Sequence, residues 1–461
     1  MPSALAGLRV IDFTSHLSGP FCAQILADQG AEVIKVERKG VGDDARKMPP
    51  HVNGEGGVFM QLNRNKRSFA VDLKSPKEVA NVLKLLDGAD VLVENFRPGT
   101  MERLGLGWKQ LSARNPRLIY CSISGFGQTG PYSDRGGFDL MAQAMSGLMS
   151  VCGPADGPPH RLPVPITDLC GGMFAAIGVL TALAARERTG RGQLVDTSLY
   201  EAGLAFAVYE AAGYFHSGQP PKRLGQAHRG SAPYQVFETK DGWVTCGAAT
   251  QAMWERLCDI LSAPQLKADP RFVEVPLRVV NHVALADALA PYFRQRKTAE
   301  WEKALLDEGI PVGPVRTYDQ VLENEHTLAR KMVLPIEHPK AGKSRILGIP
   351  IKLSATPGAI RRPAPVLGEH TDEILAELAA AAPKRLGPQA PSAKGKEALV
   401  PTRPKAAGGK TAPKRGAKQA RPAVGSKSKR APGRKPAPKA TAKPAAKRAK
   451  PAAAGPRKGR G

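Results

Sequence analysis

The chain has 461 residues and a formal net charge of +26, and this charge is concentrated at one end. Residues 381–461 contain 24 Lys or Arg residues, a single acidic residue, 13 prolines and no aromatic residue, so they carry a net +23. The first 380 residues hold 43 basic and 40 acidic residues, an ordinary balance for a globular protein. The composition therefore predicts a nearly neutral folded body and a disordered basic tail that cannot build a hydrophobic core.

Other protein classes are disfavoured by the rest of the sequence. The first residues lack the basic and apolar regions of a secretory signal, so we expect a cytoplasmic protein. The six cysteines are scattered without CxxC spacing, which argues against a disulfide framework or a zinc site. The longest uncharged run, residues 169–185, is shorter than the ~20 residues that a membrane span needs. We expect it to form a buried core helix and expect no contact with a membrane.

The first 124 residues alternate between predicted strands and helices. Strands are expected at residues 8–13, 32–37, 68–73, 90–94 and 117–124, and helices at residues 18–27, 77–86 and near 101–111. Alternation of this kind predicts an α/β fold with a doubly wound, Rossmann-like parallel sheet, which binds its ligands beyond the carboxyl ends of the strands.

The rest of the body is predicted to contain a smaller α+β domain. Its expected elements are strands at 234–237 and 243–246 and helices near 251–261, 282–295 and 298–308. A helical stretch reaching about Tyr214 precedes it, and a helix at 373–378 marks the return to the first domain. The expected divisions are a large domain of residues 1–200 and 330–380, a linker at 201–230, a small domain at 231–329 and a disordered tail at 381–461.

A glycine-rich segment follows the strand predicted at 117–124. Gly125, Gly127 and Gly130 match the GxGxxG pattern of dinucleotide-binding proteins, but the next residue is Pro131 and no helix pattern follows at once. A pyrophosphate site needs a helix whose N-terminal amides face the phosphates, so we expect a flexible loop over a ligand instead. The sequence contains no GxxxxGK[ST] pattern, which disfavours activation of a substrate by ATP.

Asp168 stands where the apolar helix is predicted to begin, and two interpretations are open. Aspartate is among the preferred N-cap residues, and its position alone favours that role. Alternatively, a carboxylate kept ionised by the helix dipole and backbone N–H groups could attack an acyl group as a nucleophile. Gly171 and Gly172 would then let a bulky ligand approach the backbone closely.

Basic side chains gather after the predicted strands. Arg38, Arg97 and Arg103 follow strand ends or lie one turn beyond them, and Lys74 could add a fourth charge. Each residue alone is typical of a solvated surface. Several cationic groups beside one crevice would suit a phosphate-bearing cofactor, because guanidinium groups bind phosphate through two parallel hydrogen bonds.

Several motifs in order make residues 5–379 resemble the family III CoA-transferases, the CaiB/BaiF superfamily that includes formyl-CoA, carnitine-CoA and bile-acid-CoA transferases. The matching segments are Gly19-Pro20, 26–37 (LADQGAEVIKVE), 65–68 (NKRS), 93–99 (VENFRPG), 115–120 (NPRLIY), the 125–132 loop, 189–193 (TGRGQ) and 367–371 (LGEHT).

The resemblance implies a reaction and a set of site residues. Asp168 falls on the family's catalytic aspartate, which would move CoA from an acyl-CoA donor to a carboxylic acid acceptor through aspartyl-anhydride and aspartyl-CoA thioester intermediates. The positions that match CoA contacts are Arg38, Val71, Lys74, Asn95, Phe96, Arg97, Arg103 and Arg135. The positions assigned to the substrate are His16, Leu17, Ser18 and His228.

The resemblance also implies that CoA is a substrate and product, with no tightly bound cofactor and no metal, and that two chains form an interlocked homodimer. Succinyl-CoA is the default donor, since it is frequent in the family. The four-glycine loop of formyl-CoA/oxalate transferases has no counterpart near residues 242–250, which disfavours oxalate as acceptor. Leu17 stands where the formyl-CoA enzymes carry a glutamine, so details of how the anhydride is stabilised do not transfer.

Two alternative functions remain open. The α-methylacyl-CoA racemases of the same superfamily use a His-Asp pair for proton transfer, and Phe138-Asp139 occupies those positions here. Phenylalanine cannot carry a proton, so we favour the transferase and expect Asp139 to be a structural hydrogen-bond acceptor. The second alternative is a nucleoid-associated protein, since the basic tail could bind DNA or RNA without reading sequence. A passive, solubilising extension is the competing interpretation of the tail.

Overall fold

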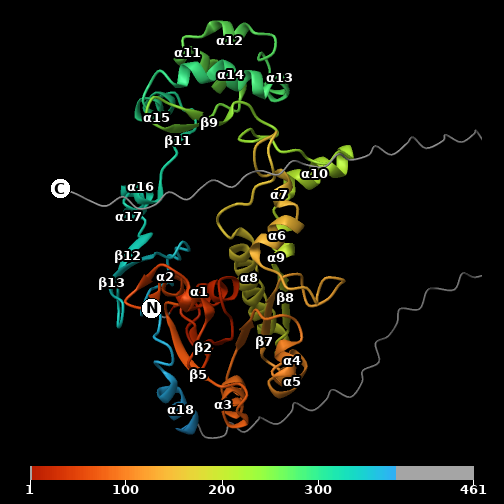
Figure 1. Cartoon of the computed structure of the whole chain (residues 1–461), viewed down its shortest axis with the longest axis vertical. Helices are drawn as coiled ribbons and strands as arrows, with labels where there is room; N and C mark the ends of the chain where they lie inside the picture. The colour runs from red at the N-terminus through yellow and green to blue at the C-terminus, as the bar shows by residue number, and fades with distance from the viewer. Residues whose placement is uncertain (1–2, 381–461) are drawn as a thin grey trace, which may run out of the picture. The chain divides into compact units, whose positions relative to one another are not determined.

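A six-stranded parallel sheet is the centre of the fold in the computed structural model, which describes residues 3–380. Its strands are β1 (Arg9–Asp12), β2 (Glu32–Arg38), β5 (Lys66–Val71), β6 (Val91–Glu94), β7 (Ile119–Ser124) and β8 (Leu194–Ser198) (Figure 1). They lie in the order β5-β2-β1-β6-β7-β8. Numbered within the sheet this is 3-2-1-4-5-6, the order of Rossmann-like proteins, so the predicted fold class is confirmed.

Helices cover both faces of this sheet. The helices found within residues 3–217 are α1 (Ser18–Asp28), α2 (Gly57–Leu62), α3 (Pro76–Asp87), α4 (Thr100–Arg103), α5 (Trp108–Arg114), α6 (Asp139–Met145), α7 (Leu148–Val151), α8 (Ile166–Thr189), α9 (Leu199–Leu204) and α10 (Val208–Ser217). The same residues also form a 3-10 turn at Asp44–Lys47 and a short hairpin of β3 (His51–Val52) and β4 (Glu55–Gly56).

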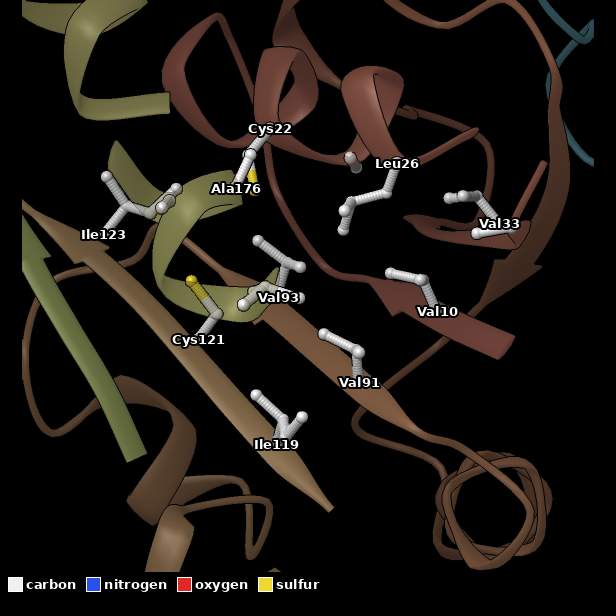
Figure 2. Close-up of a cluster of buried hydrophobic side chains, with 14 of the residues drawn as sticks. Val10, Cys22, Leu26, Val33, Val91, Val93, Ile119, Cys121, Ile123 and Ala176 are labelled. Carbon is white, nitrogen blue, oxygen red and sulfur yellow. The ribbon is translucent and has the colours of Figure 1, made fainter. Parts of the chain in front are cut away.

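The sheet separates two hydrophobic cores. Val10 packs with Cys22 of α1 and Ala176 of α8 on one face (Figure 2). Its neighbour Ile11 belongs to the core on the other face, which includes Val82 of α3. Successive side chains of a strand point to opposite faces, so the short apolar runs of β1 and β6 are buried on both sides, as parallel strands require.

A third core lies among residues 232–310. Its elements are the antiparallel strands β9 (Tyr234–Glu238), β10 (Trp243–Gly247) and β11 (Val312–Pro314), in the order β11-β10-β9, and the helices α11 (Gln251–Ile260), α12 (Pro264–Ala268), α13 (Val275–Val280), α14 (His282–Phe293) and α15 (Thr298–Asp307). Phe237 stacks on Phe293 with ring centroids 4.3 Å apart, and Trp301 packs against the same ring. Large aromatic side chains thus supply much of the buried area of this core.

The chain then returns to the parallel sheet. It passes through α16 (Tyr318–Leu322), α17 (Glu325–Ala329) and the hairpin of β12 (Val333–His338) and β13 (Gly342–Leu347), and then forms α18 (Thr371–Ala380). The His370 amide donates to the Ser68 carbonyl at 3.1 Å, and the Thr371 hydroxyl accepts from the Ala70 amide at 3.1 Å. These bonds fasten α18 beside the edge strand β5.

Among the predicted elements that differ from the structure, two carry or adjoin predicted CoA contacts. The helix expected near 101–111 is two short helices, α4 and α5, because Gly105 between them adopts a φ of +72° that a continuing helix cannot contain. Strand β5 spans residues 66–71 instead of 68–73, so Lys74 lies in the turn that leads to α3.

The expectation that residues 169–185 form a buried core helix is wrong in part. Helix α8 buries Ala175, Ala176 and Val179 against the sheet, but Phe174 and Ile177 on its other side are 38% and 56% exposed. By length and composition α8 could cross a membrane. Its buried face shows that it is a structural helix of the sheet layer. The predicted disorder of the tail concerns residues outside 3–380.

Candidate active site

The carboxyl ends of β1 and β6 meet at the point where the strand order reverses. The chain leaves β1 toward β2 on one side and leaves β6 toward β7 on the other. In doubly wound sheets this switch point opens a crevice for ligands. Asn95 joins the two loops, since its Oδ1 accepts from the Ser15 amide at 2.9 Å and its Nδ2 donates to the Ser15 carbonyl at 2.8 Å.

The loop after β1 carries three of the predicted substrate residues. His16 adopts a left-handed φ of 66° and holds its ring in solvent, 6.4 Å from the ring of Phe138 and edge-on to it. Leu17 is the N-cap residue of α1, and Ser18 is buried at its first position. Because Phe138 precedes α6, the loop after β1 lies beside the start of that helix.

Glycine brings α1 and α8 into close contact. A Cβ atom on Gly172 would lie 2.5 Å from the backbone oxygen of Ser18, so no other residue fits there without moving a helix. Gly171 is similarly confined, with the Leu199 side chain 3.0 Å from its Cβ position. The glycines following Asp168 therefore serve helix packing, which places the first turn of α8 next to the loop after β1.

Asp168 lies in this first turn, and its carboxyl group is half-buried. Helix α8 begins at Ile166 with Pro165 as its N-cap residue, so the N-cap interpretation of Asp168 is wrong. Within residues 3–380 no donor hydrogen-bonds to its carboxylate. Burial, followed by repulsion from Asp139, raises the pKa of Asp168 to about 7. The expectation that helix-end donors hold the group ionised is not met.

Asp139 is the buried acceptor that the sequence led us to expect. Its Oδ1 accepts from the Thr167 amide at 3.0 Å and from the Thr167 hydroxyl at 2.7 Å. Its Oδ2 accepts from Gln143 Nε2 at 2.7 Å. Asp139 therefore links α6 to the turn that carries Asp168. Phe138 beside it is 63% exposed and has no group that could transfer a proton.

The residues expected to contact CoA are found at or after the carboxyl ends of strands β2, β5 and β6 and in the 125–137 loop. Arg38 is exposed and donates to Asp44 Oδ1 at 2.7 Å, while the Arg97 guanidinium lies directly beside Gly136, whose Cβ position is 2.6 Å from it. The other exposed cations are Lys74, Arg103 and Arg135, the last stacked over Tyr132 at 4.0 Å.

The remaining predicted site residues are less accessible or lie elsewhere. Val71 is buried in the sheet core, so only its backbone could meet a ligand. Phe96 is half-buried and packs against the same core. The ring of His228 contacts Tyr209 and Tyr234 rather than the residues around Asp168. The structure therefore does not bring His228 to the other substrate residues.

The glycine-rich loop does not form a dinucleotide site. No helix follows Gly130 directly, and α6 begins only at Asp139. The loop instead folds back on itself, since the Cβ position of Gly125 is 2.7 Å from the Cα atom of Gly137. No group of three or more metal-ligating side chains occurs within the residues that the structure describes.

Buried charges that the sequence pattern did not predict lie near the crevice. Burial raises the pKa of Glu94, at the end of β6, to about 7. Lys35 lies in the middle of β2 and Asp12 at the end of β1, and both side chains are fully buried. A charged residue within an otherwise apolar parallel strand was the signal that could have revealed them, because such residues are almost never buried unless paired.

Comparisons with known proteins agree on one family. The profile of CoA-transferase family III matches residues 5–371. The succinyl-CoA:glutarate CoA-transferase of Mus musculus is 41% identical over 375 residues, covering 81% of this chain and 86% of that protein. The acetyl-CoA:oxalate CoA-transferase of Acetobacter aceti is 40% identical over 376 residues, covering 81% and 95%.

Solved structures give the same result. A CaiB/BaiF family protein from Brucella suis is similar with a TM-score of 0.75 and 36% identity, covering 82% of this chain and 100% of that one. The protein Rv3272 from M. tuberculosis follows with a TM-score of 0.72 and 31% identity, covering 80% and 99%.

Proposed function

The chain belongs to CoA-transferase family III and is an acyl-CoA:carboxylate CoA-transferase, and on this premise we propose that Asp168 carries the transferred groups. The observation that supports this role is its environment. It is a half-buried carboxyl group with a pKa near 7, free of hydrogen-bond donors within residues 3–380, in the helix turn beside the switch point. Carboxylates of this kind serve as nucleophiles.

The first half of the proposed reaction forms two covalent species. The Asp168 carboxylate attacks the thioester carbonyl of the donor, the C–S bond breaks, and an aspartyl-acyl anhydride and the CoA thiolate result. The thiolate then attacks the Asp168 carbonyl of the anhydride and expels the donor acid as its carboxylate. Asp168 now holds CoA as a thioester, and no bond energy from ATP has been needed.

The second half reverses these steps with another acid. The acceptor carboxylate attacks the aspartyl thioester and expels the CoA thiolate. This step leaves a new anhydride between Asp168 and the acceptor acid. The thiolate then attacks the acceptor carbonyl, giving the new acyl-CoA and regenerating the Asp168 carboxylate. The 125–137 loop and the closely packed α1–α8 contact would limit access of water to the anhydride.

Burial of Asp168 favours this covalent chemistry. Loss of the surrounding water destabilises the ionised carboxylate relative to the neutral acid, and this raises the pKa of Asp168. In the anhydride and in the thioester the negative charge has left this position, so the same desolvation favours the adducts. The higher pKa also makes the carboxylate a stronger base, while leaving a sizeable ionised fraction at neutral pH.

We propose that the cations found after the strands hold the phosphates of CoA. These are Arg38, Lys74, Arg97, Arg103 and Arg135, all of them exposed. Asn95 and Phe96 would contact CoA between these cations and Asp168, and Val71 would do so through its backbone. His16, Leu17 and Ser18 would lie beside the acyl group, and free CoA would leave with the product rather than stay bound.

Succinyl-CoA is the donor that we propose, with a carboxylic acid as acceptor. Several relatives are named for this donor, among them one with glutarate and one, 39% identical, with D-citramalate. The relative from Acetobacter aceti is named for oxalate. Oxalate therefore belongs in the acceptor panel, although the four-glycine loop is absent.

The direct test is mass spectrometry of the protein after incubation with succinyl-CoA and hydroxylamine, which traps activated acyl groups as hydroxamates. We expect the label on Asp168 in the wild type and none in Asp168→Asn. Absence of label across a panel of acyl-CoAs would refute the assignment. Rapid exchange of the α-proton of a 2-methylacyl-CoA, without CoA transfer, would instead support the racemase.

A second copy of the chain is proposed to cover the exposed apolar side of α8. Met173, Phe174, Ile177 and Leu180 are each 38% or more exposed along one helix, which is unusual for a surface in contact with water only. We propose that these residues lie within an interlocked homodimer. Sedimentation analysis should give twice the chain mass, and Ile177→Glu should lower it.

The basic tail supports an additional binding role. Residues 381–461 carry a net +23 without an aromatic residue, a composition suited to phosphates rather than to bases. We propose a cytoplasmic enzyme whose tail holds it on DNA or RNA without sequence preference. Filter binding should show DNA retained by the full chain and released by a 1–380 truncation, and equal retention would refute the proposal.

A further inference from the structure

A cluster of buried charges lies directly beneath the loop after β1. Asp12, Lys35 and Lys66 are completely buried at the ends or centres of β1, β2 and β5, and Asp43 is 4% exposed in the segment after β2. We propose that Asp43, anchored by Lys35, is a positioning residue for CoA transfer that fixes the loop presenting His16 to the active site. This inference rests on the proposed role of the site.

Asp43 binds the loop through two hydrogen bonds to one oxygen, and the same oxygen caps the 3-10 turn at Asp44–Lys47 through Ala45. Its Oδ1 accepts from the Ser15 hydroxyl at 2.7 Å, the His16 amide at 3.0 Å and the Ala45 amide at 2.9 Å. The His16 amide bond matters most, because His16 has a left-handed φ of 66° that is unfavourable for a residue with a Cβ atom. Asp43 therefore holds His16 in a conformation that the free loop would leave.

Lys35 holds Asp43 and the loop from below. Its Nζ lies 2.9 Å from Asp43 Oδ2 and donates to the Thr14 carbonyl at 2.8 Å. Its third neighbour, Asp12 Oδ2, is 3.9 Å away. One buried ammonium group thus contacts both the residue that fixes the loop and the loop backbone itself.

Lys66 completes the cluster on the other side of Asp12. Its Nζ donates to Asp12 Oδ2 at 2.9 Å, to the Pro20 carbonyl at 3.0 Å and to Asn63 Oδ1 at 2.9 Å. Asp12 in turn accepts from the amide of Thr14 at 2.8 Å. With two acids and two lysines, the cluster is neutral, so it neither attracts nor repels an anionic acyl-CoA.

Stability alone does not explain such a cluster. Buried ion pairs contribute little net stability, because each ion loses its water, and apolar residues of similar size often replace them without loss. The cluster supplies directed hydrogen bonds to the loop residues Thr14, Ser15 and His16, and to Pro20 in the first turn of α1. A hydrophobic core would leave these backbone groups unfixed.

The position of the loop bears directly on the site. Ser15 is bonded twice to Asn95, the His16 ring contacts the Phe138 ring, and the Ser18 carbonyl lies against Gly172 in α8. The loop therefore contacts Asn95 after β6, Phe138 before α6, and α8, the helix that carries Asp168. A displacement of ~1 Å at such a site can lower a rate about 100-fold.

Asp43→Asn is the variant that tests the inference. The amide oxygen can still accept from the loop, but the amide nitrogen then faces the Lys35 ammonium group, so the side chain cannot satisfy both. Asp28→Asn is the matched control. Asp28 also forms a buried ion pair, 2.6 Å from Arg64, but at the opposite end of α1.

The measurement is the rate at which succinyl-CoA produces the hydroxylamine-trapped label on Asp168. We expect Asp43→Asn to slow labelling about 10- to 100-fold relative to Asp28→Asn, with similar free energies of unfolding for both. Asp43→Glu should recover part of the rate. Ser15→Ala, which removes a single bond to Asp43, should slow labelling by a smaller factor and serves as the readout if Asp43→Asn does not fold.

Hydrogen exchange of the folded proteins gives a second readout. Amides of residues 13–18 should exchange faster in Asp43→Asn than in Asp28→Asn. Equal labelling rates in the two variants, or unchanged exchange in the loop, would overturn the inference. A wild type that acquires no label would instead refute the proposed function of Asp168, so the two failures are distinguishable.

Discussion

The substitution Asp139→Asn offers a sharp test of the electrostatics at Asp168. Asp139 is buried, forms no ion pair within residues 3–380 and repels the Asp168 carboxylate. Replacing it with Asn removes the charge and keeps the shape. Its acceptor bonds from Thr167 can remain, while the bond from Gln143 is lost, because two amide NH2 groups, both hydrogen-bond donors, would face each other there.

The size of the effect follows from the pKa of Asp168, which is raised from 3.8 to about 7. A rise of about 3 corresponds to ~4 kcal/mol against the ionised form. Burial is the larger of the two causes of this rise, so repulsion from Asp139 accounts for less than half of it. We expect Asp139→Asn to lower the pKa of Asp168 by about 1. At pH 6 the ionised fraction would increase from about a tenth to about a half.

The assay is the pH dependence of Asp168 labelling by succinyl-CoA in a single turnover. We expect the acid limb of the profile, near pH 7 in the wild type, to lie about one pH unit lower in Asp139→Asn, whatever the absolute rate. Thr167→Val is the control, since it removes a hydrogen bond to Asp139 and keeps the charge. An acid limb that stays in place in Asp139→Asn, or that shifts as far in Thr167→Val, would refute the reasoning.

Three further predictions concern stability. The folded-state pKa of Asp168 lies above its unfolded value, so the wild type loses stability as pH rises from about 4 to about 7. Asp168→Asn should therefore raise the free energy of unfolding at pH 8 by up to ~4 kcal/mol, measured by urea titration. The same variant should abolish CoA transfer. Glu94→Gln should likewise stabilise by up to ~3 kcal/mol at pH 8 and by much less at pH 4.5, since the Glu94 pKa is also raised; equal gains at both pH values would contradict this. Gly172→Ala places a Cβ atom 2.5 Å from the Ser18 oxygen and should cost about 1–3 kcal/mol, whereas Gly213→Ala, with nothing within 4 Å, should cost none.

The order of elements was readable from the sequence because each depends on neighbouring residues. The alternation of apolar strands with amphipathic helices predicted the parallel sheet, and the boundaries of β1, β2 and β6 lie within two residues of expectation. The motifs around Arg38, Asn95 and Asp168 likewise placed these residues at strand ends or a helix start. Local pattern sufficed because it reports which faces are buried.

Only the tertiary structure determined the properties that depend on contacts between residues distant in the sequence. Asp12, Lys35, Asp43 and Lys66 come from four parts of the chain, and nothing in their sequence spacing shows that they share one buried site. The raised pKa of Asp168 depends on burial and on Asp139, which lies 29 residues earlier in the sequence. Charge interactions act through space and through the local loss of water, so only the folded arrangement determines them.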